Sequence, residues 1–340
     1  MGNGKVLVAM SGGVDSSAAA YLLKEAGYEV AGVTMTLSSA DDGRAAALCE
    51  ALGIRHHAPD FRELFRREVI EPFIADYRGG LTPNPCAVCN KAVKFGALFD
   101  YMNQNGFDCL ATGHYARITE EPDGYALRKG TDAAKDQSYM LSGIPKERLG
   151  RILFPLGGMT KPQARDTLNA AGLPGADQSE SQDICFIPDG DVKGFIEANS
   201  PEPPREWVFV DAAGRILGRR TAAGGFTVGQ RKGLNIAAGA PAYVCKIDAA
   251  AGIVIMGGDD DLFTREFVAE RFNWLAMPFT GPARVTAKVR YHHKEQQALA
   301  EPITPNRVRV TFDEPQRAIT PGQTAVLYDG DRVLGGGVII

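Results

Sequence analysis

The stretch KVLVAMSGGVDSS, residues 5–17, holds the pattern that decides the fold. A short apolar run at residues 5–10 leads into a turn with two glycines, and residues 16–26 are rich in Ala and Leu. This order predicts a β-strand, a tight turn and an α-helix. Glycines let a ligand approach the backbone closely, and the first amides of a helix attract negative charge. The turn is therefore a candidate site for a phosphate group.

Strands and helices continue to alternate up to about residue 200. The patterns predict strands at residues 29–35 and 108–112, and helices at residues 44–52 and 61–77. Such alternation predicts an α/β domain with a mostly parallel sheet covered on both faces. Ligands of these sheets bind beyond the carboxyl ends of the strands. Both SGGVDSS (11–17) and TGHYAR (112–117) fall there.

The rest of the chain is predicted to be β-rich. SPEPPREW (200–207) contains three prolines and is typical of a linker. Beyond it, residues 284–291, 306–312 and 324–340 alternate apolar and polar residues, and the last contains a DGD turn suited to a hairpin. We expect a first domain over 1–198, a small middle domain over 199–265 and a C-terminal β-barrel over 266–340.

Composition narrows the class of protein. The 340 residues are 44% hydrophobic and 23% charged, close to a globular average, and they leave room for two or three domains. No apolar run approaches the ~18 residues of a membrane span, and the N-terminus lacks a secretory pattern. We expect a soluble cytoplasmic protein with no membrane association. The net charge is −4, so any RNA binding must come from a local basic patch.

The turn at residues 11–17 differs from the Walker loop, which needs GxxxxGK followed by Ser or Thr. A Walker loop holds the β and γ phosphates for γ transfer. SGGxDS instead resembles the PP-loop of enzymes that split ATP into AMP and pyrophosphate. The resemblance implies an ATP site with Asp15 holding the Mg²⁺–pyrophosphate. The expected nucleotide contacts are Ser11, Gly12, Gly13, Val14, Asp15, Ser16 and Ser17, with Met35 and Gly113 beside the adenine.

Six cysteines occur in the chain: Cys49, Cys86, Cys89, Cys109, Cys185 and Cys245. Cys49 and Cys109 lie in apolar patterns and are expected to be packing residues. Cys86 and Cys89 form a C-x-x-C just before a predicted helix at 91–101, where a helix N-terminus stabilises a thiolate. Cys185 follows about a hundred residues later in SQDICFI (181–187).

Four chemistries fit one C-x-x-C and one distant cysteine. A structural zinc site needs four Cys or His ligands, and the pattern supplies no second pair. A thioredoxin-like redox pair would have no need of an ATP loop. A cluster held by three cysteines, with one iron open to bind sulfide, is a third interpretation. The fourth is a persulfide relay, in which one thiol carries sulfur and another releases it.

Nine motifs together resemble the tRNA-specific 2-thiouridylase family over nearly the whole chain. They are SGGVDSS (11–17), TPNPCAVCN (82–90), ATGHYAR (111–117), KDQSYML (135–141), FPLGGMTKPQAR (154–165), SQDICFI (181–187), FTVGQRKGL (226–234), KVRYHH (288–293) and PGQTAVLY (321–328). The resemblance implies a PP-loop ATP-binding and catalytic domain, a small middle domain and a C-terminal tRNA-binding β-barrel. The implied activity is ATP-dependent formation of 2-thiouridine at the wobble position of Lys, Glu and Gln tRNAs.

The resemblance also implies roles for single residues. Cys89 would be the nucleophile and Cys185 the persulfide carrier, supplied by a cysteine desulfurase or a persulfide relay protein. Asn84, Pro85 and Cys86 would contact the target uridine. The other implied tRNA contacts are His114, Lys135, Asp136, Gln137, Arg290, Tyr291 and Gln323. Many relatives have Asp where this chain has Cys86, so a 4Fe-4S cluster on Cys86, Cys89 and Cys185 stays open beside the relay.

Two other functions share some of these features. A different PP-loop enzyme, such as an argininosuccinate or GMP synthetase, would use the same ATP loop without the three cysteines. A non-catalytic RNA-binding or iron–sulfur sensor module would bind ATP without releasing pyrophosphate.

Overall fold

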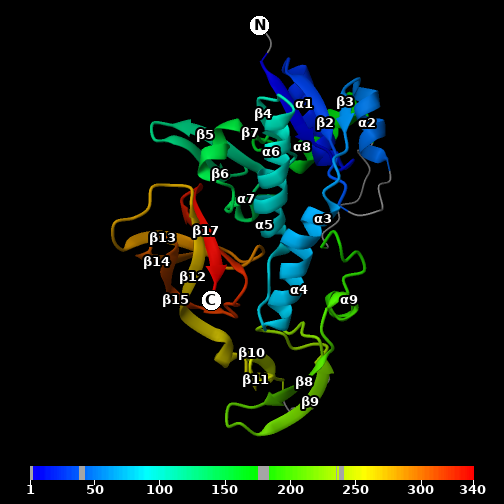
Figure 1. Cartoon of the computed structure of the whole chain (residues 1–340). Helices are drawn as coiled ribbons and strands as arrows, with labels where there is room; N and C mark the ends of the chain where they lie inside the picture. Colours follow the sequence, from blue (N-terminus) through cyan, green and yellow to red (C-terminus); the bar gives the residue numbers. More distant parts are fainter. Residues whose placement is uncertain (1–2, 38–42, 175–183, 235, 237–240) are drawn as a thin grey trace. The chain divides into compact units, whose positions relative to one another are not determined.

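The computed structural model of the chain describes residues 3–37, 43–174, 184–234, 236 and 241–340. By its internal contacts the chain divides into two units. The first contains residues 1–68, 86–182 and 330–333, and the second contains residues 69–85, 183–329 and 334–340. Figure 1 colours the chain along its sequence. The domain boundaries expected at residues 198 and 265 stay a prediction.

The first unit is built on a five-stranded parallel sheet. Its order is β3-β2-β1-β4-β7, and neighbouring strands pair in parallel. The strands are β1 Lys5–Ala9, β2 Glu29–Val33, β3 Arg55–His57, β4 Cys109–Ala111 and β7 Ile152–Leu153. The chain runs from β1 outward to β3, then crosses back to β4 on the other side of β1. The carboxyl ends of β1 and β4 therefore form the switch point at which such sheets bind ligands.

Helices accompany this sheet, in the blue to green part of Figure 1. They are α1 Val14–Glu25, α2 Arg44–Leu52, α3 Arg62–Phe65, α5 Pro85–Cys89, the π-helical η2 Asn90–Ala97, α6 Leu98–Gln104, α7 Ser138–Leu141, the 3-10 helix η3 Lys146–Arg151 and α8 Lys161–Ala170. Cys49 on α2 is fully buried with Val6 and Leu48, as expected for a packing residue. Cys109 is half-buried against the same cluster.

A hairpin of β5 Ala116–Glu121 and β6 Gly124–Lys129 completes the first unit. Arg332, at the start of β17, pairs with Arg128 of β6. Asp331 accepts hydrogen bonds from the guanidinium groups of Arg128 and Arg117. The turn at residues 330–333 is thus held to the hairpin by main-chain pairing and by charge.

The second unit contains a small sheet and two helices. The helices are α4 Glu71–Arg78, continuous in sequence with the π-helical turn η1 Arg66–Ile70, and α9 Val192–Asn199. The sheet order is β10-β11-β8-β9, with strands β8 Arg205–Val210, β9 Ile216–Ala222, β10 Tyr243–Asp248 and β11 Ile253–Gly257. Trp207, Phe209 and Phe226 form the centre of its core.

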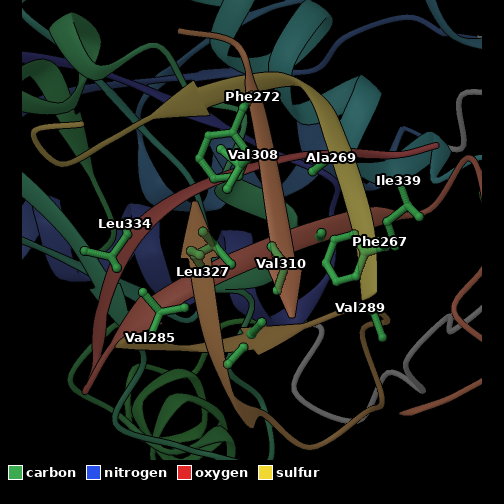
Figure 2. Close-up of a cluster of buried hydrophobic side chains, with 14 of the residues drawn as sticks. Phe267, Ala269, Phe272, Val285, Val289, Val308, Val310, Leu327, Leu334 and Ile339 are labelled. Atoms are coloured by element: carbon green, nitrogen blue, oxygen red, sulfur yellow. The ribbon is translucent and has the colours of Figure 1, made fainter. Parts of the chain in front are cut away.

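The last six strands close into a barrel. Their order is β12-β15-β14-β13-β16-β17, and β12 pairs with β17 to complete the ring. They are β12 Phe263–Trp274, preceded by the 3-10 turn η4 Asp260–Leu262, β13 Ala283–Lys288, β14 Gln296–Thr304, β15 Arg307–Arg317, β16 Thr324–Asp329 and β17 Arg332–Ile339. Figure 2 shows its core, where Phe267, Val310 and Leu327 come from three different strands. Burial of these alternating apolar side chains stabilises the ring.

The fold class expected from the sequence is confirmed: a parallel α/β domain, a small middle sheet and a C-terminal β-barrel. None of the helices in the described ranges is long and apolar enough to span a membrane. One helix prediction needs correction. The helix expected at 91–101 begins at Pro85 and runs through α5, η2 and α6 to Gln104. Pro at the first helical position suits this earlier start, because its missing N–H would have no partner within the helix.

Candidate active site

The loop after β1 has the geometry of an anion site. β1 ends at Ala9 and α1 begins at Val14, so the glycines lie at the carboxyl end of the central strand. Gly12 has a φ of 74°, and a Cβ there would lie 2.8 Å from the Cβ of Arg44, so the turn requires glycine. Gly13 is the N-cap of α1, and no described side chain caps that helix. The first amides of α1 are therefore available to a phosphate.

The serines of the loop divide into two groups. The backbone N–H of Ser11 donates to Ser16 Oγ at 3.1 Å, and Ser11 itself is exposed. Ser16 and Ser17 donate their hydroxyls to the carbonyl oxygen of Gly13 at 3.1 and 2.8 Å. Ser17 is fully buried, and so is nearly all of Val14. The hydroxyls of Ser16 and Ser17 therefore stabilise the turn itself, while the Ser11 side chain is exposed.

Asp15 is the charged residue of the loop, and it has two close partners. Lys161 Nζ lies 2.7 Å from each carboxylate oxygen of Asp15, and the Tyr115 hydroxyl donates to Oδ1 at 2.7 Å. Lys161 is only 8% exposed. Sequence reasoning did not single out Lys161 or Tyr115, although both lie in quoted motifs, FPLGGMTKPQAR and ATGHYAR. Lys161 brings a cation to a loop that otherwise contains no basic side chain.

Gly113 lies against the same loop. A Cβ at Gly113 would lie 2.6 Å from the backbone carbon of Asp15 and 2.7 Å from the nitrogen of Ser16. The turn after β4 therefore touches the turn after β1 directly, and only glycine allows this approach. Met35 is half-buried two residues after β2 ends. The adenine contacts expected of Gly113 and Met35 stay a prediction.

His114 follows Gly113 and is held as a neutral imidazole. Its Nδ1 lies 2.6 Å from Thr112 Oγ1, and the rings of Phe95 and Phe154 lie 5.9 Å away. Burial lowers the pKa of His114 well below its usual value, and the charge of Lys94 lowers it further. At neutral pH His114 therefore supplies no positive charge.

The two cysteines of the C-x-x-C lie one turn apart on α5. Cys86 is in the first turn and is exposed, whereas Cys89 is at the end of α5 and is buried. We expected the helix start to favour the thiolate. Instead, desolvation by the surrounding protein raises the pKa of the Cys86 thiol, and Lys94 only partly opposes this rise.

Cys185 is exposed in a turn of the second unit, whereas Cys86 and Cys89 belong to the first. All six cysteines are thiols in this structure. Within the described ranges, no three His, Cys, Asp or Glu side chains gather as a metal site. The residues at 181–183, which complete the SQDICFI motif, lie outside the described residues.

The expected tRNA contacts at 135–137 are tied to the ATP loop through Tyr115. The backbone N–H of Tyr115 donates to Gln137 Oε1 at 3.0 Å, and the N–H of Gln137 donates to the carbonyl of Tyr115 at 2.9 Å. Asp136 accepts from the N–H groups of Gly130 and Ser138. Lys135 is half-buried. Asp136 and Gln137 therefore order this segment, whatever they contact in RNA.

Arg290 and Tyr291 lie in the second unit. Arg290 Nη2 donates to the carbonyl oxygens of Val228 and Ala318, both at 3.0 Å. The ring of Tyr291 contacts His292 at 4.9 Å between centroids, and Lys288 lies over it. The guanidinium of Arg290 thus has a structural task that the sequence did not reveal.

Comparison with known proteins gives matches along the whole chain. The family models that match are the tRNA methyl transferase HUP domain at residues 4–189, the tRNA methyl transferase PRC-barrel domain at 193–258 and the aminomethyltransferase beta-barrel domain at 264–339. A solved NMN synthetase from Francisella tularensis is similar at 21% identity and a TM-score of 0.34, over 53% of this chain and 67% of that one.

Two curated relatives are similar from end to end. The tRNA-specific 2-thiouridylase MnmA of Acidithiobacillus ferrooxidans is 45% identical, over 100% of this chain and 99% of its own. The protein of the same name from Moorella thermoacetica is also 45% identical, over 98% of both chains. The matched lengths span the PP-loop turn, the C-x-x-C helix and the closed barrel alike. The chain belongs to the tRNA-specific 2-thiouridylase family.

Proposed function

We propose that the chain is an ATP-dependent tRNA sulfurtransferase that forms 2-thiouridine at the wobble position of Lys, Glu and Gln tRNAs. Its relatives are named as tRNA-specific 2-thiouridylases over their full length. The observation that carries the proposal is the PP-loop: an uncapped helix N-terminus with Lys161 beside it, in a chain that also presents a C-x-x-C helix. The tRNA and a sulfur donor protein, a cysteine desulfurase or a persulfide relay protein, are the proposed partners.

The loop residues fit a Mg²⁺–ATP complex. The first amides of α1 and the Lys161 ammonium would hold phosphate oxygens. Phosphate oxygens compete with Asp15 for Lys161, and this competition would free the Asp15 carboxylate to hold Mg²⁺. With the phosphates held, the uridine O2 attacks the α-phosphorus and pyrophosphate leaves. The C2 oxygen thereby becomes part of AMP, which is a good leaving group.

Sulfur transfer to the activated base then requires two thiols, those of Cys185 and Cys89. A donor loads Cys185 with a second sulfur, giving a persulfide. The terminal sulfur attacks C2, the C2–O bond breaks and AMP leaves. The Cys89 thiolate attacks Cys185 Sγ, the S–S bond breaks, and 2-thiouridine is released while Cys89 and Cys185 form a disulfide. A dithiol reductant returns both to thiols before the next cycle. Asn84, Pro85 and Cys86 would contact the uridine.

The cluster route replaces this relay. A 4Fe-4S cluster held by Cys86, Cys89 and Cys185 would bind sulfide at its open iron and deliver it to the same adenylated base. Cys86 separates the two routes, because the relay needs only Cys89 and Cys185 as reacting thiols, whereas the cluster needs all three sulfurs as ligands.

The test separates activation from RNA binding. Asp15→Ala should abolish pyrophosphate release from ATP and unmodified tRNA, while tRNA binding stays within a few fold. Asp166→Ala, which removes an exposed carboxylate on α8, is the matched control and should keep both. Equal loss of pyrophosphate release and RNA affinity in Asp15→Ala would contradict the assignment.

A different PP-loop ligase remains the second candidate, because the sheet and loop alone would serve it equally well. It has no use for Cys185. Full turnover of the Cys185→Ser variant would therefore favour a ligase over a sulfurtransferase.

A further inference from the structure

The corner between β15 and β16, residues 318–323, is braced on several sides within the second unit. Arg290 donates to the carbonyl of Ala318 at 3.0 Å and to the hydroxyl of Thr320. The N–H of Gly322 donates to the carbonyl of Ile339 at 2.9 Å, and the N–H of Ile339 donates to the carbonyl of Gln323 at 2.9 Å. The corner is therefore fixed to the last strand of the barrel.

This corner is hydrogen-bonded to the segment 82–84. The N–H of Thr82 donates to the carbonyl of Pro321 at 2.9 Å. The Gln323 side-chain amide donates to the carbonyls of Thr82 and Pro83 at 2.8 and 3.2 Å. Asn84 Nδ2 donates to Thr324 Oγ1 at 3.3 Å. Each residue of the segment therefore has at least one hydrogen bond to the barrel.

The corner also packs closely against the segment 82–84. A Cβ on Gly322 would lie 2.7 Å from the nitrogen of Thr82, and Gly322 has a φ of 92°. Thr82 and Asn84 are 8% and 9% exposed. Loss of a donor would leave buried carbonyl oxygens without their partner, which is more costly than losing an exposed bond.

The segment has no regular secondary structure of its own, and it leads straight into α5 at Pro85. Its hydrogen bonds to the barrel therefore fix the backbone that enters α5 at Pro85. We propose that Gln323 is a positioning residue, which holds Thr82 and Pro83 so that the cysteine helix starts in the place the reaction needs. This inference rests on the proposed role of these thiols, and it gives Gln323 a task besides the expected contact with tRNA.

The test compares three substitutions in the full chain. Gln323→Ala removes both hydrogen bonds from Nε2, and Gln323→Glu keeps the shape but sets carboxylate oxygens against carbonyl oxygens. Gly322→Ala presses on Thr82 from the other side. Gln316→Ala is the matched control, because its side-chain amide donates to the local carbonyl of Glu314, two residues away. Thermal melting confirms that each variant is folded.

The first readout is the rate at which iodoacetamide alkylates Cys89, followed by peptide mass spectrometry. Cys89 is buried at the end of α5, so a loosened helix start should expose its thiol, and the rate should rise several-fold in all three variants and stay unchanged in the control. An unchanged Cys89 rate in Gln323→Ala and Gln323→Glu overturns the inference, whatever happens to activity.

The second readout is thiolation. The two Gln323 variants should lose between about tenfold and a hundredfold in kcat, as expected for a displaced catalytic group, while the tRNA Kd stays within about twofold. A raised tRNA Kd with unchanged kcat would make Gln323 an RNA contact only and would also overturn the inference. If the wild type thiolates no tRNA, the proposed function fails, but the alkylation comparison still decides the positioning role.

Discussion

Lys161 Nζ lies 2.7 Å from both carboxylate oxygens of Asp15, so the ammonium of Lys161 neutralises the charged residue of the PP-loop. The sequence could predict the loop, because strand, glycines and helix follow one another within thirteen residues, 5–17. It could not predict the pairing of Asp15 with Lys161, since the two are far apart in the chain and the sheet topology brings them together. A lysine inside a quoted motif was the only sequence feature that pointed to it.

At the same scale, Cys86 separates the two sulfur routes. A persulfide relay needs a carrier and a resolving thiol, so Cys86 would only shape the uridine pocket or assist proton transfer. Cys86→Ala should then keep measurable thiolation with a persulfide donor under air, whereas Cys89→Ala and Cys185→Ala should be inactive. Thiolated tRNA is quantified by mass spectrometry of its nucleosides.

The cluster route predicts a different outcome from the same variants. Three cysteines ligate the cluster, so all three alanine variants would be equally inactive. The wild type would also work only when anaerobic and loaded with iron. That combination would exclude the relay.

His114 gives a prediction about pH. Its folded-state pKa is depressed by burial and by Lys94, while the unfolded chain binds the proton near the usual value of about 6.5. The unfolded state therefore holds more protons at acidic pH. The stability linked to this group is fully present above about pH 6.5 and is lost as the pH falls, by up to about 1.4 kcal/mol per pH unit.

Denaturant unfolding of the wild type and of His114→Gln between pH 7.5 and pH 5 measures this term. The variant should lose less stability on acidification than the wild type. His292→Gln, at an exposed histidine of the second unit, should keep the wild-type slope. Parallel slopes for the wild type and His114→Gln would show that His114 titrates normally.

At the scale of elements, α8 positions Lys161 through its N-terminus. Thr160 is the N-cap, and its hydroxyl accepts from the N–H of Gln163, whose side chain accepts from the N–H of Thr160. This capping box fixes the turn in which Lys161 is the first helical residue. The position of the Lys161 ammonium thus depends on the two hydrogen bonds between Thr160 and Gln163.

Thr160→Ala should therefore lower the free energy of unfolding by about 1 kcal/mol. It should also weaken ATP binding, because the turn that carries Lys161 loosens. Thr167→Ala is the control, since that hydroxyl only bonds to the carbonyl of Gln163 inside the helix. Calorimetry of unfolding and of ATP binding checks both effects. Loss of stability without any change in ATP affinity would mean that the cap does not position Lys161.

The elements that the sequence predicted correctly are those with a strong local pattern. Helix 44–52 matches α2, and the strand at 29–35 contains β2. The short strands β3 and β7 have three and two residues, so no periodicity marks them. The cysteine helix was placed too late because its first turn, PCAVC, carries few strong helix formers and its start is set by contacts with distant residues.

At the scale of the whole molecule, an acidic chain has to bind an acidic substrate. The net charge of −4 offers no general attraction for RNA, so the contacts must be local. The sequence predicted both Lys135 and Arg290 as contacts. In the structure Arg290 also braces the backbone of Val228 and Ala318, which no sequence pattern could show.

The two residues should therefore respond differently to substitution. Lys135→Ala should weaken tRNA binding and lower its salt slope by roughly one unit. Arg290→Ala should also lower the melting temperature, because it removes the hydrogen bonds to the carbonyls of Val228 and Ala318 and to the Thr320 hydroxyl. Filter binding over a range of salt concentrations, with melting curves alongside, measures both. An unchanged slope for Lys135→Ala would place the RNA surface elsewhere.

The central claim is that this chain breaks the bond between the α and β phosphates of ATP in order to thiolate tRNA. The most direct test gives the wild type unmodified tRNA, a persulfide donor and one of three nucleotides. ATP should support thiolation, and so should the analogue whose β–γ bridge is a methylene, because that bond is never broken. The analogue with a methylene between the α and β phosphates should give none. Thiolation with the α–β analogue, or its loss with the β–γ analogue alone, would contradict the account.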